Sequence, residues 1–129
     1  MHGEDSDPRP AREAFILWLE SVCAEVRALE AQAEKELHDV EDEASYRETM
    51  RRKALLLSSL PEKGRDALSV LMPDVRAPIE DRLQRFAASA ANALRIGSVF
   101  YMSALLYPED YQQGDPNDLE RFLQDCKRV

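Results

Sequence analysis

Three side chains that could bind a metal ion share one face of a predicted long helix: Glu34, His38 and Glu41. Helical bundles bind paired metal ions with a carboxylate from each of two helices and a Glu-x-x-His motif from each of two others. The sequence contains no Glu-x-x-His motif. We therefore expect no metal site, and we interpret His38 as a boundary residue of the helix.

Two cysteines are the other candidates for chemistry, as nucleophiles. Cys23 falls between apolar residues of the same predicted helix, where a buried structural thiol is expected. Cys126 stands beside Lys127 and Arg128, cations that favour a thiolate, but no histidine lies nearby in the sequence to act as its base. The four glycines are isolated, so no phosphate-binding loop is present. We expect no catalytic residue and no cofactor, and therefore not an enzyme.

The composition predicts one all-α domain in a reducing compartment. The chain has 129 residues, of which 44% are hydrophobic and 33% charged, with only 4 glycines, a profile typical of helices. The two cysteines form no disulfide framework, and the acidic start, MHGEDSDPRP, lacks the features of a signal peptide. The apolar segment 87–107 contains Asn92 and Arg95, which argue against a transmembrane helix. We expect a cytoplasmic protein without membrane contact.

Nucleic-acid binding is not expected either. The segment LPEKGRDALSVLM has features of the first helix of a helix-turn-helix regulator, but no tight turn and recognition helix follow it. The chain as a whole is acidic, with a pI of about 4.8, whereas phosphate binding draws on a positive surface. Eight basic residues could still form a patch: Arg51, Arg52, Lys53, Lys63, Arg65, Arg76, Arg82 and Arg85.

The spacing of apolar residues predicts the first long helix. Steps of three and four connect Phe15, Leu19, Val22, Val26, Leu29, Ala33, Leu37, Val40 and Ala44, so a helix should extend from about residue 9 or 11 to at least residue 43. Two continuations remain open. Ser45 and Glu48 have capping-box spacing and would start a new helix at Tyr46, whereas the absence of glycine and proline over 41–53 would permit one continuous helix.

Prolines and caps divide the rest of the chain. Ser59 and Pro61 start a short helix that ends before Pro73, and Pro78 opens a second long helix with Gly97 on its apolar stripe. Asp115 and Pro116 start a last helix that ends near Lys127. We predict an all-α, elongated helical bundle with two long antiparallel helices, 11–43 and 78–107, and shorter connecting helices. Residues 1–8 would be a flexible acidic N-terminus and 9–129 a single helical domain.

The charge changes sign along the chain. Residues 1–50 carry a net charge of −9, residues 51–106 carry +4 and residues 107–129 carry −3. The acidic first helix should therefore lie beside the basic segment, where the charges would set register and partner choice more than stability. A folded-back monomer and an antiparallel, coiled-coil-like dimer both satisfy this pattern, and solvated helix faces are the simplest alternative.

These features predict a protein–protein interaction module of the adaptor, chaperone or inhibitor type, acting as a homodimer or as a subunit of a complex. The segment FILWL is apolar around much of the helix, and two tyrosines flank an acidic turn after the second long helix. The predicted contact residues are Phe15, Trp18, Leu19, Glu30, Glu34, Glu41, Asp42, Tyr107 and Tyr111. The alternative is a small-ligand-binding protein or enzyme with a pocket along the 78–107 helix, whose apolar face includes Phe100, Tyr101, Leu105 and Leu106.

Overall fold

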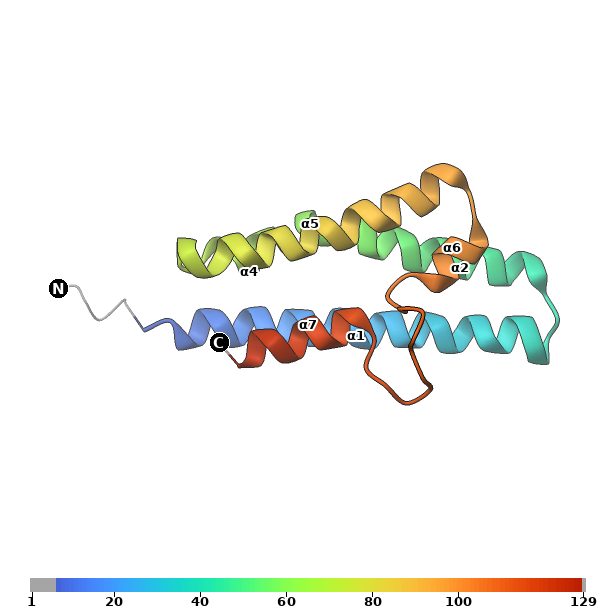
Figure 1. The fold of residues 1–129 in the computed structure, drawn as a ribbon, viewed down its shortest axis with the longest axis horizontal. Coiled ribbons are helices and arrows are strands. Elements are labelled where there is room, and N and C mark those ends of the chain that lie inside the picture. The colour runs from blue at the N-terminus through green and yellow to red at the C-terminus, as the bar shows by residue number, and fades with distance from the viewer. Residues whose placement is uncertain (1–6, 129) are drawn as a thin grey trace.

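A computed structural model describes residues 7–128, and over this range the chain is an elongated bundle of helices without a strand (Figure 1). The elements are α1 (Arg9–Glu34), its π-helical continuation η2 (Lys35–Asp39), α2 (Glu43–Ser58), α3 (Leu60–Lys63), α4 (Arg65–Ser69), α5 (Pro73–Ile96), α6 (Val99–Ala104) and α7 (Asp118–Lys127). The predicted all-α bundle is confirmed. The predicted flexible N-terminus lies mostly outside the described residues, because residues 1–6 are not among them.

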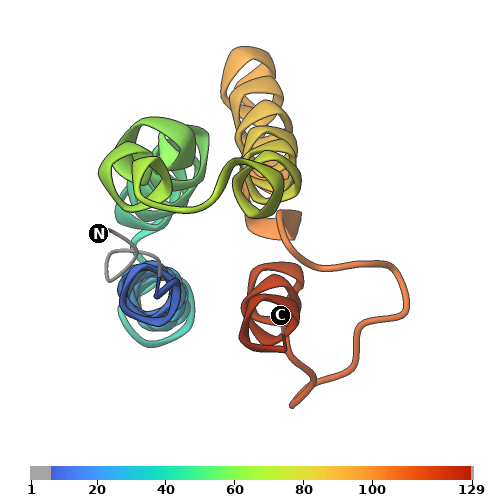
Figure 2. The same ribbon diagram turned by 90° about the vertical axis from the view of Figure 1, so that its left-hand side faces the viewer.

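Viewed end-on, the helices of the bundle stand in separate columns (Figure 2). They are α1, α2 continued by α3 and α4, α5, and α7, and successive columns run in opposite directions (Figures 1 and 2). The two longest helices, α1 and α5, therefore run in the same direction. The antiparallel pairing predicted for the two long helices is made instead by α1 with α2, so the acidic α1 packs against the more basic α2.

The reversal between α1 and α2 shows why the first helix stops before residue 43. The π-helical turn ends at Asp39, and Glu41 adopts a left-handed conformation with φ of 56°. Asp42 then caps α2 by accepting a hydrogen bond from the backbone N–H of Ser45 at 3.1 Å. The predicted extension to residue 43 is wrong, and so is a start at Tyr46, since the capping side chain belongs to Asp42 and not to Ser45.

The second long helix begins and ends earlier than predicted. Pro73 occupies its first turn, so Pro78 lies inside the helix. Gly97 is not part of an apolar stripe but ends α5, with φ of 75° and its N–H directed at the carbonyls of Ala93 and Leu94. A left-handed residue at this position is a common helix stop because glycine adopts it without steric cost. The predicted helix 78–107 is thus divided into α5 and α6.

The core follows the apolar stripe of α1 that the spacing predicted. Phe15, Leu19, Val22, Val26 and Leu29 are buried. They pack in one cluster with residues of every other column, among them Leu57, Leu60, Leu83, Leu119 and Phe122. Within the described residues, no helix is both long enough and apolar enough to span a bilayer.

Candidate functional site

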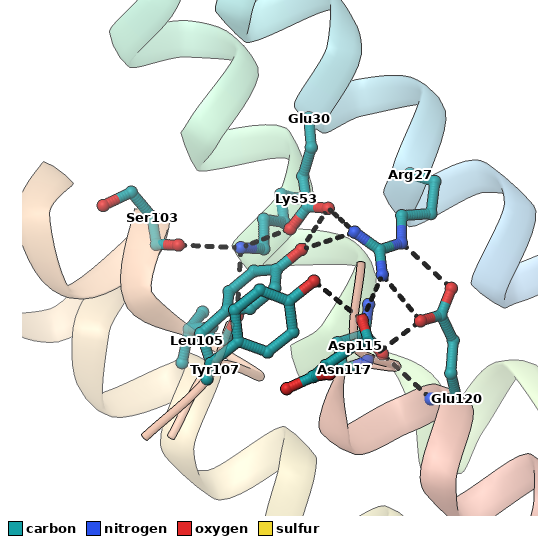
Figure 3. Close-up of polar contacts among 10 residues, drawn as sticks. Arg27, Glu30, Lys53, Ser103, Leu105, Tyr107, Asp115, Asn117 and Glu120 are labelled. Carbon is teal, nitrogen blue, oxygen red and sulfur yellow. Dashed lines mark hydrogen bonds and ion pairs between the residues drawn. The ribbon is translucent and has the colours of Figure 1, made fainter. Parts of the chain in front are cut away.

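A buried lysine, Lys53, is the centre of a polar network in the middle of the bundle (Figure 3). Its side chain is 0% exposed. The ammonium lies 2.9 Å from Glu30 Oε2 and donates hydrogen bonds of 3.1 Å to the carbonyl oxygens of Ser103 and Leu105. These carbonyls lie at the C-terminal end of α6, where the helix dipole favours a cation. The buried charge is therefore compensated from two directions.

The position of Lys53 follows from the helical period of α2. Thr49, Met50, Ala54 and Leu57 are buried on the inner face of α2, and Lys53 lies among them in the same stripe. Arg51 and Arg52, its neighbours in the sequence, are exposed. Of the three consecutive basic residues that follow the acidic stretch, only Lys53 is buried, and the other two face solvent.

Tyr107, which follows α6, and Arg27 of α1 extend the network to the last helix. The hydroxyl of Tyr107 donates to Glu30 Oε1 at 2.6 Å, and Arg27 donates to the same hydroxyl at 3.2 Å. Arg27 also donates to both carboxylate oxygens of Glu120, at 2.9 and 2.7 Å. Glu120 forms a reciprocal capping box with Asn117 at the start of α7. Asn117, rather than the predicted Asp115, is therefore the cap, and the network fixes where α7 begins.

Burial and pairing determine the protonation states. Burial lowers the pKa of Lys53, and the Glu30 carboxylate opposes this shift. Burial also raises the pKa of Tyr107, which keeps its hydroxyl protonated as a donor to Glu30. The hydrogen bonds from Arg27 hold the pKa of Glu120 below its ordinary value, and the same contact raises the pKa of Arg27. Arg27 and Glu120 are therefore an ion pair at neutral pH.

A cavity of about 450 Å³ opens beside this network. Its walls come from α1, α2, α6 and the segment that follows α6, and its lining residues are Arg27, Glu30, Ala31, Ala33, Glu34, Tyr46, Met50, Lys53, Ser103, Tyr107 and Tyr111. The rings of Tyr107 and Tyr111 meet edge to face with centroids 4.7 Å apart. We call this cavity the tyrosine pocket.

Four of the nine predicted contact residues line the tyrosine pocket: Glu30, Glu34, Tyr107 and Tyr111. The structure brings them together from sequence positions almost 80 residues apart, as the Tyr107–Glu30 hydrogen bond shows. Glu41 and Asp42 are exposed on the α1–α2 turn. Residues 34–48, which include this turn, contain seven acidic and two basic residues, a net charge of −5. We call them the acidic end.

The other three predicted contact residues lie in or on the core. Phe15 and Leu19 are buried, with 1% and 0% exposure, so neither offers a surface to a partner in this fold. Trp18 is half-buried, and its ring lies over Gly64, so that a Cβ built at Gly64 would come within 2.7 Å of the indole. The wide apolar character of FILWL is explained by burial against α4 and its neighbours. Leu17 alone in that segment is strongly exposed.

Exposed apolar side chains stand at the end of α5 and the start of α6. Ile96, Phe100 and Tyr101, which we call the α6 corner, are 50%, 70% and 51% exposed. Ser103, one turn after Phe100 on α6, lines the pocket and donates its hydroxyl to the Phe100 carbonyl at 2.7 Å. Tyr46 of α2 and Val99 of α6 pack on the same small cluster. The helix that bears Phe100 and Tyr101 therefore borders both the pocket and the start of α2.

The structure gives the two thiols no catalytic environment. Burial raises the pKa of Cys23 to about 12 and that of Cys126 to about 11. Such thiols are protonated at neutral pH and are poor nucleophiles. Among residues 7–128, no three His, Cys, Asp or Glu side chains are grouped so that they could hold a metal ion. His38 lies 3.5 Å from Glu34 on the helix surface.

In the sequence Lys53 stands out only as one of several basic residues that follow the acidic stretch. A lysine at an inward position of an apolar stripe must be paired when it is buried, so the stripe could have identified it. Arg27 and Tyr46 carried no such signal, because their roles depend on which helices become neighbours. No protein-family model matches the chain, and neither a curated protein nor a solved structure matches it.

Proposed function

We propose that this protein is an interaction module that binds a cationic, partly apolar segment of another protein. The binding surface consists of the tyrosine pocket, the acidic end and the α6 corner. One observation carries the proposal: Tyr46, near the start of α2, and Ser103 of α6 line the same pocket, so the helix that follows the acidic turn and the helix that bears the exposed Phe100 and Tyr101 meet there.

The tyrosine pocket suits a lysine or arginine side chain of the partner. Aromatic faces attract cations, and Tyr107 already has the ammonium of Lys53 at 5.1 Å and the guanidinium of Arg27 at 6.0 Å from its ring centroid. Tyr46 and Tyr111 add aromatic wall, and the exposed carboxylate of Glu34 supplies a counter-charge at the rim. The aliphatic stem of such a side chain would contact Ala31 and Met50.

The α6 corner would supply most of the affinity and the acidic end most of the orientation. Phe100 and Tyr101 have ring centroids 5.7 Å apart and together present an aromatic anchor of the kind that dominates binding energies. Exposed charges contribute little to affinity, but they speed association and exclude partners of the same sign. We therefore expect binding that weakens with salt but is not abolished by it.

A pair of matched variants tests this proposal. In Phe100→Ser/Tyr101→Ser the α6 corner is removed, whereas Val70→Ser/Met72→Ser removes two exposed apolar residues, 61% and 53% exposed, at the α4–α5 turn. The probe is a fluorescent 18-residue amphipathic peptide of leucine and lysine, and the same peptide with glutamate replaces it as the control. Fluorescence anisotropy gives the dissociation constant, and circular dichroism confirms that each variant is folded.

We expect the lysine peptide to bind and the corner variant to bind it at least about tenfold more weakly, as loss of an aromatic anchor implies. The variant at the α4–α5 turn should bind like the parent protein. Equal affinity for the lysine and glutamate peptides, or an unchanged affinity of the corner variant, would contradict the proposal. Affinity capture from native lysate with the same variants then identifies the partner whose retention depends on the α6 corner.

The corner variant also tests whether the protein forms a homodimer through the α6 corner. Sedimentation velocity of the parent protein and of Phe100→Ser/Tyr101→Ser measures the oligomeric state directly. A dimer that dissociates in the corner variant would make a second copy of this chain the occupant of the corner. A dimer that persists would place the contact between copies elsewhere and leave the corner available to a different protein.

A further inference from the structure

We infer a second binding site, for a small amphiphilic anion such as a medium-chain carboxylate, in the cleft between α5 and α7. The cleft has a volume of about 440 Å³, within the usual range of about 300 to 1,000 Å³ for ligand pockets. Three arginines line it, Arg82 and Arg85 from α5 and Arg121 from α7. Its apolar lining includes Phe86, Leu105 and Leu106. The site is independent of the proposed partner surface.

The three guanidiniums keep hydrogen-bond donors for a ligand. Arg82 lies over the Phe122 ring at 4.8 Å and is 3.6 Å from Asp125, a separation longer than a hydrogen bond. Arg121 donates to the carbonyl of Pro116 at 3.4 Å, near the limit for such a bond. A carboxylate that accepts from two guanidiniums would form shorter, charge-assisted bonds.

The two acidic residues of the cleft have partners or a helix end to stabilise them. Asp125 pairs with Arg128 as well as with Arg82. Asp118 occupies the first turn of α7, where the helix dipole favours a carboxylate. Arg85 pairs with Asp81 on the surface at 3.0 Å, with both side chains mostly exposed, and such a pair is easily exchanged. The rim therefore favours an anion over a cation.

The apolar part of the cleft defines the other half of the ligand. Phe86 is half-buried and contacts Phe122 with ring centroids 5.8 Å apart, and Leu105 is half-buried beside it. Leu106 adopts a left-handed conformation with φ of 80°, and the consecutive residues Leu105 and Leu106 both line the cleft. A purely ionic ligand would leave this apolar lining exposed to water, whereas an aliphatic chain of a few carbons would cover it.

A larger cleft does not define a ligand in this way. It has a volume of about 630 Å³ and lies between α3, α4 and α5. Arg65 and Arg76 line it together with Glu62 and Glu80, and Arg76 lies 3.8 Å from Glu80. The two arginines and two glutamates balance one another, and no aromatic side chain is among the lining residues of this cleft to favour a cation. The combination of an arginine rim with an apolar floor is what assigns a ligand class to the α5–α7 cleft.

Three eight-carbon probes test the site: octanoate, octan-1-ol and octylammonium, each titrated into the full chain and followed by methyl NMR. We expect octanoate to shift the methyl signals of Leu57, Leu105 and Leu106 and to bind at least about tenfold more tightly than the other two, because only octanoate forms charge-assisted hydrogen bonds with the rim. Equal binding of the three probes would overturn the inference, as would shifts confined to Leu68 and Leu83 in the larger cleft.

A pair of matched variants tests whether the arginines of the rim bind the carboxylate of octanoate. Arg85→Gln/Arg121→Gln should weaken octanoate binding at least about tenfold and leave octan-1-ol within about twofold of the parent. Arg51→Gln/Arg95→Gln, which changes the net charge equally at exposed positions outside the cleft, should bind octanoate like the parent. Equal losses in the two variants would show only a general charge effect and overturn the site. Binding to phosphatidylglycerol vesicles without a response to free octanoate would also overturn it.

Discussion

Two regions of this bundle bury ionisable side chains in opposite ways. In the apolar region, around Trp18, Cys23 and Cys126, burial raises the pKa of both thiols and keeps them neutral. In the polar region, around Arg27, Glu30 and Lys53, each charge is compensated by an opposite charge or by backbone carbonyls. The stability of the apolar region should therefore depend on the volume of its side chains, and the stability of the polar region on its charge balance.

The largest effect is expected where one charge of the polar region loses its partner. Glu30→Gln removes the carboxylate 2.9 Å from the Lys53 ammonium and leaves that cation buried without a counter-charge. Breaking a buried pair in this way costs about 3–5 kcal/mol. We expect the free energy of unfolding, measured by urea titration, to fall by an amount near the lower end of this range, because Glu30 is 17% exposed.

The companion variants separate charge balance from packing. Lys53→Met/Glu30→Gln replaces both charges by groups of similar volume, and it should regain most of the stability that Glu30→Gln loses, since replacing both ions of a buried pair is often neutral. If the double variant is as unstable as the single one, the region depends on shape and the contrast with the apolar region disappears.

A smaller loss is expected in the apolar region from one added methyl group. In Gly64→Ala the new Cβ would lie 2.7 Å from the Trp18 ring, closer than carbon atoms pack. The ring is held by Phe15, with centroids 5.6 Å apart, so it cannot move freely. Overpacking of this kind costs about 1–3 kcal/mol.

Thermal unfolding of Gly64→Ala in two backgrounds checks the cause. Trp18→Phe removes the part of the indole that the new methyl would meet, so Gly64→Ala should cost less in that background than in the parent. An equal cost in both backgrounds would mean that the backbone at Gly64, and not the contact with Trp18, is responsible.

The two regions also differ in how far the sequence predicts them. The inward stripe of α1 followed from spacing, because a helix that buries one face needs an apolar residue every three or four positions. The turn after α1 did not follow, because Glu41 adopts a left-handed conformation that usually calls for glycine. Hydrogen bonds of Asp42 offset this cost: its N–H donates to the Glu36 carbonyl, and its carboxylate accepts from the Ser45 N–H.

The contacts of the polar region are harder still to predict from the sequence, because they depend on tertiary structure. Glu30, Tyr107 and Tyr111 were predicted as contact residues for a partner, and the structure shows that Glu30 and Tyr107 contact each other. Lys53 was assigned only to a basic run. Which carboxylate, hydroxyl and carbonyls surround a buried ammonium is decided by the arrangement of α1, α2, α6 and α7. Spacing along one helix carries no information about that arrangement.

The smallest expected effect concerns pH and has opposite signs in the two regions. Burial raises the pKa of Cys126 from 9.0 to about 11, so between these values the unfolded thiol loses its proton while the folded thiol keeps it. The unfolded state is then favoured as pH rises, by about 1.4 kcal/mol at pH 10. Relative to Cys126→Ala, the parent protein should lose this much additional stability between pH 8 and pH 10, as measured by urea titration.

Lys53 should show the reverse slope. Its pKa is lowered by burial, so as pH approaches 10.5 the folded protein releases the lysine proton before the unfolded chain does. Unfolding then requires proton uptake, and rising pH stabilises the folded state through this residue. The parent protein should therefore gain stability relative to Lys53→Met/Glu30→Gln as pH rises toward 10.5. If the stability of the two proteins instead changes in parallel with pH, the Glu30 carboxylate and the two carbonyls fully offset the burial of the ammonium. The pKa of Lys53 would then not be lowered in the folded protein.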